Sequence, residues 1–171
     1  MITVCSELCN SFSQRIYDTI ISRVNIFSLV CTCGCKGTLV YHGSYMRHLK
    51  DGSECFSLKI QRVQCRQCQR THALMPYFLV PYSQVSLHEQ KKVLAAIYAG
   101  TSLPALLRDS ASLDESYVRY LLRKFRKHWE QRLYALHLSL TDRLTVPCLS
   151  FYSRQFMQIR NTPNILFSPS T

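Results

Sequence analysis

The cysteines are the residues whose type and spacing indicate chemistry most directly. Five of the nine cysteines in this 171-residue chain fall into two tight groups, Cys31-x-Cys33-Gly34-Cys35 and Cys65-x-x-Cys68. Thiolates from two short turns are typical ligands of a tetrahedral ion, and zinc suits such a donor set best. The second pair is unambiguous, whereas any two of the first three thiols can complete the site. Four thiolates leave no open position for a substrate, so we expect a structural Zn²⁺.

The segment between the two cysteine groups predicts a β-hairpin. Residues 39–41 and 56–60 are strand-like, and Asp51-Gly52 is a typical turn between them. Together with the cysteines this predicts a zinc ribbon over residues 31–75. We interpret His42, His48 and His72 as surface or packing residues rather than as metal ligands.

The N-terminal residues 1–30 are expected to contain one helix. Apolar residues recur at three- and four-residue steps between Asn10 and Val24, which predicts an amphipathic helix there. Cys5 and Cys9 are interpreted as small buried residues, because free cysteine commonly behaves as one. After the ribbon, the passage bounded by Pro76 and Pro81 is linker-like.

Residues 86–138 predict three helices in the order of a helix-turn-helix domain. Ser86 and Glu89 form a capping box, and Gly100 is a typical helix end. Ser102 then caps a short helix that runs to about Arg108. A second box, which begins at Ser112, starts a long helix that runs to about residue 137.

The long helix has an apolar stripe and an opposite basic face. The stripe that should close a core consists of Val118, Leu121, Leu122, Phe125, Trp129, Leu133 and Leu136. The predicted DNA-binding residues of the basic face are Ser116, Arg119, Tyr120, Arg123, Lys124, Arg126 and Lys127. Early residues of such a helix can meet base edges in a major groove, and the later cations can meet phosphates.

The charge of the chain also favours a polyanionic partner. The formal net charge is +11, from 21 Lys and Arg against 10 Asp and Glu. Within the predicted ribbon the candidate DNA contacts are Arg47, Lys59, Arg62, Arg66 and Arg70. Duplex DNA is therefore the expected partner, since each cation that meets a phosphate releases a counterion.

Other functions are disfavoured by what the sequence lacks. The acids are isolated and form no three-carboxylate group for two-metal catalysis, so we predict that the protein is not an enzyme. No apolar run is long enough to span a membrane, and closely spaced cysteines are typical of metal sites in a reducing cytoplasm. The apolar and basic tail, residues 139–171, either folds back on the core or offers a segment to a protein partner. The alternative function is thus a protein-interaction module that docks a larger enzyme, and the oligomeric state stays open.

Two runs of the chain carry a family resemblance. They are CTCGCKGTLVYHGSYMRHL and LKIQRVQCRQCQRTHALMPYFLVPYSQ, and in them the chain resembles an uncharacterised bacterial zinc-ribbon family often found near mobile elements. The layout is also similar to the N-terminal ribbon plus helix-turn-helix part of some insertion-sequence transposases. The resemblance maps a C-x-C-G pair onto Cys31 and Cys33 and implies a DNA-associated role. The expected fold is therefore α+β, with a small zinc-ribbon hairpin domain beside a helical helix-turn-helix domain.

Overall fold

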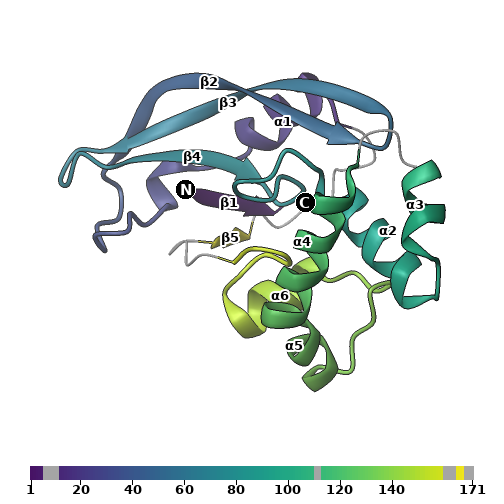
Figure 1. The fold of residues 1–171 in the computed structure, drawn as a ribbon. Coiled ribbons are helices and arrows are strands. Elements are labelled where there is room, and N and C mark those ends of the chain that lie inside the picture. The colour runs from purple at the N-terminus through teal and green to yellow at the C-terminus, as the bar shows by residue number, and fades with distance from the viewer. Residues whose placement is uncertain (6–11, 110–112, 160–164, 168–171) are drawn as a thin grey trace. The chain divides into compact units, whose positions relative to one another are not determined.

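The computed structural model describes residues 1–5, 12–109, 113–159 and 165–167, and they form an α+β fold, as expected (Figure 1). The chain divides into two compact units. Unit 1 comprises Met1–His48, Phe56–Leu79 and Arg160–Thr171, and unit 2 comprises Leu49–Cys55 and Val80–Ile159. Each unit has its own buried apolar side chains, such as Leu74 in unit 1 and Trp129 in unit 2.

The sheet of unit 1 is larger than the predicted hairpin. Its strands are β1 (Ile2–Cys5), β2 (Leu39–Asp51), β3 (Glu54–Cys65), β4 (Thr71–Pro76) and β5 (Ile165–Phe167), in the order β2-β3-β4-β1-β5. β3 and β4 are antiparallel, whereas β1 runs parallel to both β4 and β5. All four residues of β1 are buried. The N-terminus, for which we predicted only a helix, therefore also supplies an inner strand.

The hairpin of β2 and β3 is where the sequence predicted it, but its strands are longer. The turn at Gly52 has a φ of 58°, a conformation that glycine adopts at little cost. His48 Nδ1 lies 2.9 Å from Ser57 Oγ across the pair. Both strands extend beyond the short apolar runs from which they were predicted. The additional residues are mostly polar, because much of this hairpin is exposed to solvent.

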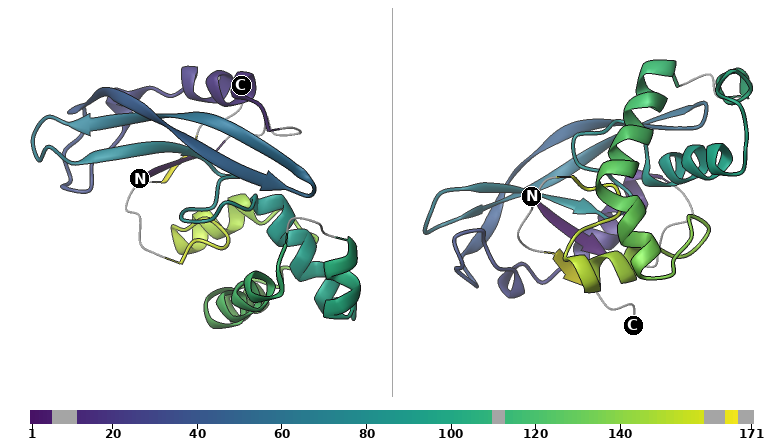
Figure 2. Two further views of the ribbon diagram at one scale, coloured as in Figure 1. Left: turned by 45° about the horizontal axis from the view of Figure 1, so that its top comes forward. Right: turned by 60° about the horizontal axis from the view of Figure 1, so that its bottom comes forward.

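Helix α1 (Gln14–Ser22) lies alongside β3 in unit 1 (Figure 2). It begins after its cap Ser13, later than predicted, and Asn10 lies outside the described residues. Gln14 Oε1 accepts a hydrogen bond from the Lys59 amide at 2.7 Å. The Tyr17 hydroxyl donates to the Leu74 carbonyl at 3.1 Å and accepts from the Gln61 amide at 2.6 Å. These bonds tie α1 to β3 and β4.

The structure also shows the burial of Cys5 and of the passage between Pro76 and Pro81. Cys5 is buried, as predicted, whereas Cys9 lies outside the described residues. A single turn of 3₁₀ helix, η1 (Ile26–Ser28), precedes the first cysteine group. The passage that we predicted to be linker-like begins at the end of β4, and Phe78, Leu79 and Val80 within it are buried.

Unit 2 contains the three predicted helices and a further helix, α6, in the tail. They are α2 (Leu87–Tyr98), α3 (Leu103–Asp109), α4 (Glu115–Phe125), the π-helical segment η2 (Arg126–Glu130), α5 (Gln131–Ala135) and α6 (Thr145–Tyr152). The segments α4, η2 and α5 follow one another without a break over residues 115–135 and correspond to the predicted long helix. No helix among the described residues has the length and apolar character needed to cross a membrane.

The predicted caps are formed in part. Ser86 Oγ accepts a hydrogen bond from the Glu89 amide at 2.9 Å, but the Ser86 amide donates to the Lys50 carbonyl rather than to the Glu89 carboxylate. Gly100 ends α2 with a φ of 91°, as predicted. The long helix begins after Asp114, whose Oδ1 accepts from the Tyr117 amide at 2.7 Å. The predicted cap Ser112 lies outside the described residues.

The described part of the tail folds back on unit 2 and joins the sheet of unit 1. Phe156 is fully buried, with its ring centroid 5.4 Å from that of Trp129 and 6.2 Å from that of Phe125. Cys148 and Leu149 of α6 are also buried. β5 pairs with β1 through Thr3 and Ile165. The tail is therefore a structural part of both units.

Candidate functional site

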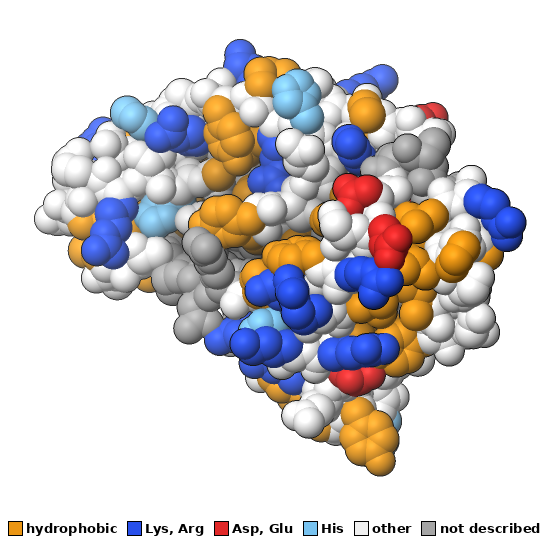
Figure 3. Space-filling model, viewed as in Figure 1, with side chains coloured by type: hydrophobic (Ala, Val, Ile, Leu, Met, Phe, Trp, Pro, Cys, Tyr) orange, Lys and Arg blue, Asp and Glu red, His pale blue; other side chains and the backbone are white. Residues whose placement is uncertain are grey.

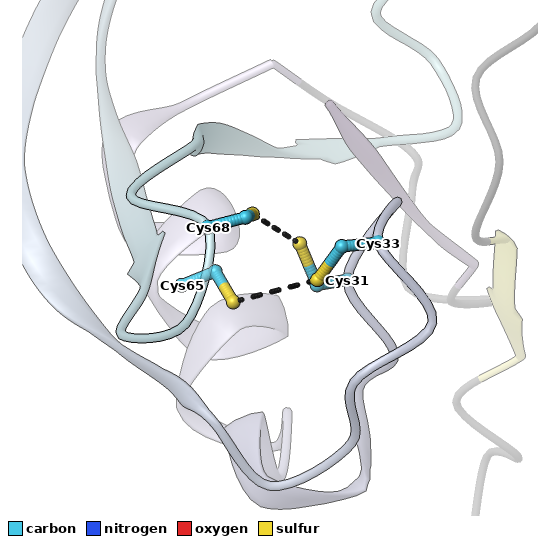
Figure 4. A group of neighbouring side chains, drawn as sticks. All are labelled: Cys31, Cys33, Cys65 and Cys68. Atoms are coloured by element: carbon cyan, nitrogen blue, oxygen red, sulfur yellow. Dashed lines mark hydrogen bonds between the residues drawn. The ribbon is translucent and has the colours of Figure 1, made fainter.

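Four cysteine sulfurs meet in unit 1 (Figure 4). The Sγ atoms of Cys31, Cys33, Cys65 and Cys68 all lie within 4.8 Å of one another. The Cys31–Cys68 distance is 3.5 Å and the Cys33–Cys65 distance is 3.8 Å. Tetrahedral Zn–S bonds of about 2.3 Å require sulfurs about 3.8 Å apart. The cluster therefore has nearly the dimensions of a tetrathiolate site.

The first pair of sulfurs comes from a tight loop before β2. The Gly34 amide donates to the Cys31 carbonyl at 2.8 Å, and the Cys31 amide donates to the Cys35 carbonyl at 2.8 Å. Gly34 has a φ of 89°, which favours glycine. This loop brings Cys31 and Cys33 to the second pair and leaves Cys35 outside the group of four. The residues that the resemblance implied are thus the ones brought together.

The second pair of sulfurs comes from the turn between β3 and β4. The Gln69 amide donates to the Cys65 carbonyl at 2.9 Å, and Gln69 has a φ of 58°. The Cys65 amide donates to the Arg70 carbonyl at 3.0 Å. Because Cys65 ends β3 and the turn closes at once, Cys65 and Cys68 face the same space.

The thiols of the cluster differ in pKa. The Thr38 hydroxyl, 3.2 Å from Cys65 Sγ, and the Cys68 amide lower the pKa of Cys65 to about 6. The Cys35 amide is the main cause of the lowered pKa of Cys33. The Arg70 amide is the largest single influence on Cys68, and it lowers the pKa of this thiol. Burial and the neighbouring sulfurs together outweigh it and raise the pKa of Cys68 to about 12. Four thiolates at this spacing need a cation between them, and a divalent soft metal meets that need.

His72 lies against the cluster, although the sequence analysis assigned it no role there. The residue is 3% exposed, and Nε2 is 3.3 Å from Cys31 Sγ. Burial, followed by the N-terminal amine and Arg70, lowers the pKa of His72. The signal that could have found this residue is its position four places after Cys68, in the strand that leaves the second cysteine turn.

The predicted DNA-binding face of the long helix is accessible in unit 2. Ser116, Arg119, Tyr120, Arg123, Arg126 and Lys127 are exposed, and Lys124 is half-buried. A shallow depression is lined by Arg119, Leu122, Arg123, Arg126 and Lys127. Lys and Arg side chains gather over the α4 region of this unit in Figure 3. Two of the cations make cation–π contacts with Tyr120. Arg123 Cζ lies 5.9 Å and Lys124 Nζ lies 5.4 Å from its ring centroid.

The opposite face of the same helix fills the core of unit 2. Val118, Leu121, Phe125, Trp129 and Leu133 are buried, as the apolar stripe predicted. Leu122 and Leu136, which we placed on the stripe, are only half-buried. Asp114 and Glu115 stand at the helix start, where Asp114 is the cap.

The predicted contacts of the ribbon differ in exposure. Lys59, Arg66 and Arg70 are exposed, whereas Arg47 and Arg62 are half-buried. Arg47 Nη1 lies 3.7 Å from Met75 Sδ, and Arg70 Nη1 donates to Thr32 Oγ1 at 3.3 Å. Arg66 and Arg70 flank Cys68, so the second cysteine turn carries positive charge at its surface.

The fold and the cluster define an α+β protein with a group of four cysteines that could hold a metal ion. Residues 31–114 match the model of a family described as a domain of unknown function (DUF6431). The matched segment contains all four cysteines of the cluster, the hairpin, α2 and α3. No curated protein and no solved structure matches the chain.

Proposed function

We propose that this protein is a zinc-stabilised DNA-binding protein, of the transcriptional-regulator or transposition-accessory kind. The observation that carries the proposal is the cationic depression on the long helix, where Arg119, Arg123, Arg126 and Lys127 surround Leu122. Among the described residues the one ion pair is Arg119–Glu115, so the other three cations of the depression have no salt-bridge partner there. Cations grouped in this way are suited to DNA phosphates, which release counterions when neutralised.

In this proposal the long helix makes the main contacts with DNA. α2, α3 and α4 follow in the order of a helix-turn-helix unit, and α4 presents its polar face to solvent. Ser116, Arg119 and Tyr120, near its start, would face base edges in the major groove. Arg123, Lys124, Arg126 and Lys127 would face the phosphates. The resemblance to the ribbon and helix-turn-helix part of insertion-sequence transposases supports this assignment.

In this proposal zinc has a structural part. Cys31, Cys33, Cys65 and Cys68 would hold it, and the metal would join the loop before β2 to the turn after β3. All four positions would be filled by thiolates, so the proposal assigns no reaction to the metal. The described cysteines are free thiols, which agrees with a reducing cytoplasm.

The test is a selection of bound duplexes from a random pool, with metal quantified on the same protein sample. We expect enrichment of duplex DNA and one zinc per chain. A parallel titration with the Arg123→Ala/Lys127→Ala variant should show weaker binding than the parent protein. Absence of binding to any duplex at low salt by a zinc-loaded sample would refute the proposal.

A protein-docking function is the second candidate, and exposed apolar residues of α6 favour it. Val146 is 56% and Phe151 is 69% exposed, whereas Cys148 and Leu149 of the same helix are buried. Deletion of the tail cannot test this candidate, because Phe156 belongs to the core of unit 2. Val146→Asp/Phe151→Asp is the sharper variant. Loss of a stoichiometric protein partner by this variant, with DNA binding absent in both proteins, would favour docking.

A further inference from the structure

We propose that His72 positions the metal ligand Cys31 by donating an N–H···S hydrogen bond to it, without binding the metal itself. The inference rests on the proposed metal site and adds a residue that neither the cysteine motif nor the family match assigns. His72 is the second residue of β4 and pairs with Val63 of β3. It therefore comes from the sheet, 41 residues along the chain from Cys31.

The position of the ring is well defined by burial and by both of its nitrogens. Only 3% of His72 is exposed. Nε2 lies 3.3 Å from Cys31 Sγ, and Nδ1 lies 3.1 Å from the nitrogen of Met1. A buried imidazole with a partner at each nitrogen has one orientation, because rotation of the ring would break both contacts.

The contacts of the two ring nitrogens also indicate which of them carries the hydrogen. As an ammonium or as an amide, the Met1 nitrogen has no lone pair with which to accept, so Nδ1 accepts from either of these forms. A neutral ring then carries its hydrogen on Nε2, the atom that faces Cys31 Sγ. Cys31 thus receives a donor on the side that faces the sheet.

The distances between the possible ligand atoms indicate that His72 is not one of the metal ligands. The four cysteine sulfurs all lie within 4.8 Å of one another, and His72 is outside that mutual group although it is close to Cys31. A tetrahedral site is complete with four thiolates, so a fifth donor has no position to occupy. A hydrogen bond to a coordinated thiolate is the role that remains.

This hydrogen bond would connect the metal centre to the sheet. Cys31 is in a loop, whereas His72 lies in a strand whose next residues pair with β1 through Leu74 and Met75. Partners of this kind orient a ligand, and their loss typically lowers metal affinity about 10- to 100-fold. We expect a loss of that size for His72→Phe, which removes the donor and keeps a ring of similar size.

The experiment measures metal affinity and ligand type in the full chain. Zn²⁺ affinity is obtained by competition with a chelator for the parent, His72→Phe, His72→Gln and the control His42→Gln, whose histidine is exposed on β2. Co²⁺ replaces zinc in each protein, and its absorption spectrum distinguishes four sulfurs from three sulfurs and one nitrogen. Nitrogen NMR of the imidazole in the zinc-loaded parent reports the tautomer.

The expected result has four parts. The parent and every variant give a four-sulfur Co²⁺ spectrum, the zinc affinity of His72→Phe falls about 10- to 100-fold, and the control matches the parent. The His72 hydrogen is on Nε2. A Co²⁺ spectrum of three sulfurs and one nitrogen in the parent, an Nδ1–H tautomer, or unchanged affinity in folded His72→Phe would overturn the proposal. If His72→Phe does not fold, the NMR result on the parent still decides. A parent that binds no zinc refutes the metal site itself, which separates that failure from this one.

Discussion

Replacing Arg123 and Lys127 by alanine should reduce the salt dependence of DNA binding by a predictable amount. Both residues are exposed and line the same depression, with Arg119 and Arg126 beside them. Neither has a salt-bridge partner among the residues that the structure describes. The substitution therefore removes two cations from the proposed interface without leaving a buried charge unpaired.

The magnitude follows from the number of phosphates that the depression can neutralise. Four cations that each meet one phosphate contribute a slope of about −3.6 to the plot of log affinity against log salt. That slope corresponds to a loss of about 150-fold between roughly 50 and 200 mM salt. The double variant keeps two of the four cations, so the slope should become less steep by about 1.8, and this part of the loss should shrink to about 12-fold.

Fluorescence anisotropy with a labelled duplex at several salt concentrations measures these slopes. The matched control is Lys92→Ala/Arg143→Ala, which removes the same charge from exposed positions of unit 2 outside the depression. We expect its slope to change much less than that of the test variant. Equal changes in the two variants would show that net charge alone matters, and an unchanged slope in the test variant would refute the proposed interface.

Further predictions concern the metal centre and the helices. Cys33→Ser should lose zinc affinity and Cys35→Ser should keep it, as measured by metal counting, because only the first of these sulfurs belongs to the group of four; the reverse order would contradict the ligand set. Ser86→Ala should lower the free energy of unfolding by about 1 kcal/mol in denaturant titrations, because the amide of α2 loses its cap; an unchanged midpoint would contradict this. The Ser116 hydroxyl, followed by the Tyr117 amide, lowers the pKa of Asp114, so its contribution to stability is present above the ordinary carboxyl pKa and is lost as pH falls through the lowered value. Acid titrations of the parent and of Asp114→Asn should therefore converge at low pH, and a constant difference between them would be evidence against this effect.

The sequence predicted what is determined by local chemistry. The two cysteine groups, the turn at Gly52 and the end of α2 at Gly100 are each signalled by the residues that form them. The buried face of the long helix was also predicted, because a helix of this length repeats its pattern often enough to be recognised. Its start differs from the prediction because Asp114, a second polar residue near the same turn, accepts a hydrogen bond from a helix amide.

The sequence did not predict what depends on distant segments. β1 has four residues, and no local pattern distinguishes them from a buried coil. Their strand conformation arises from pairing with β4 and β5, which come from far along the chain. His72 was missed for the same reason, since its contact with Cys31 exists only when β4 is placed in the sheet.

The distribution of charge between the two units indicates a different role for each unit in the proposed DNA binding. Unit 1 contains nine Lys and Arg against two acids, whereas unit 2 contains twelve against eight. The larger excess therefore belongs to the unit that carries the cysteine cluster, although the ordered cationic depression belongs to the helical unit. An excess spread over Lys59, Arg66 and Arg70 acts at a distance and speeds encounter with a polyanion, whereas a fixed group of guanidiniums on one helix determines orientation. In the proposed function, unit 1 attracts DNA and unit 2 sets how it is bound.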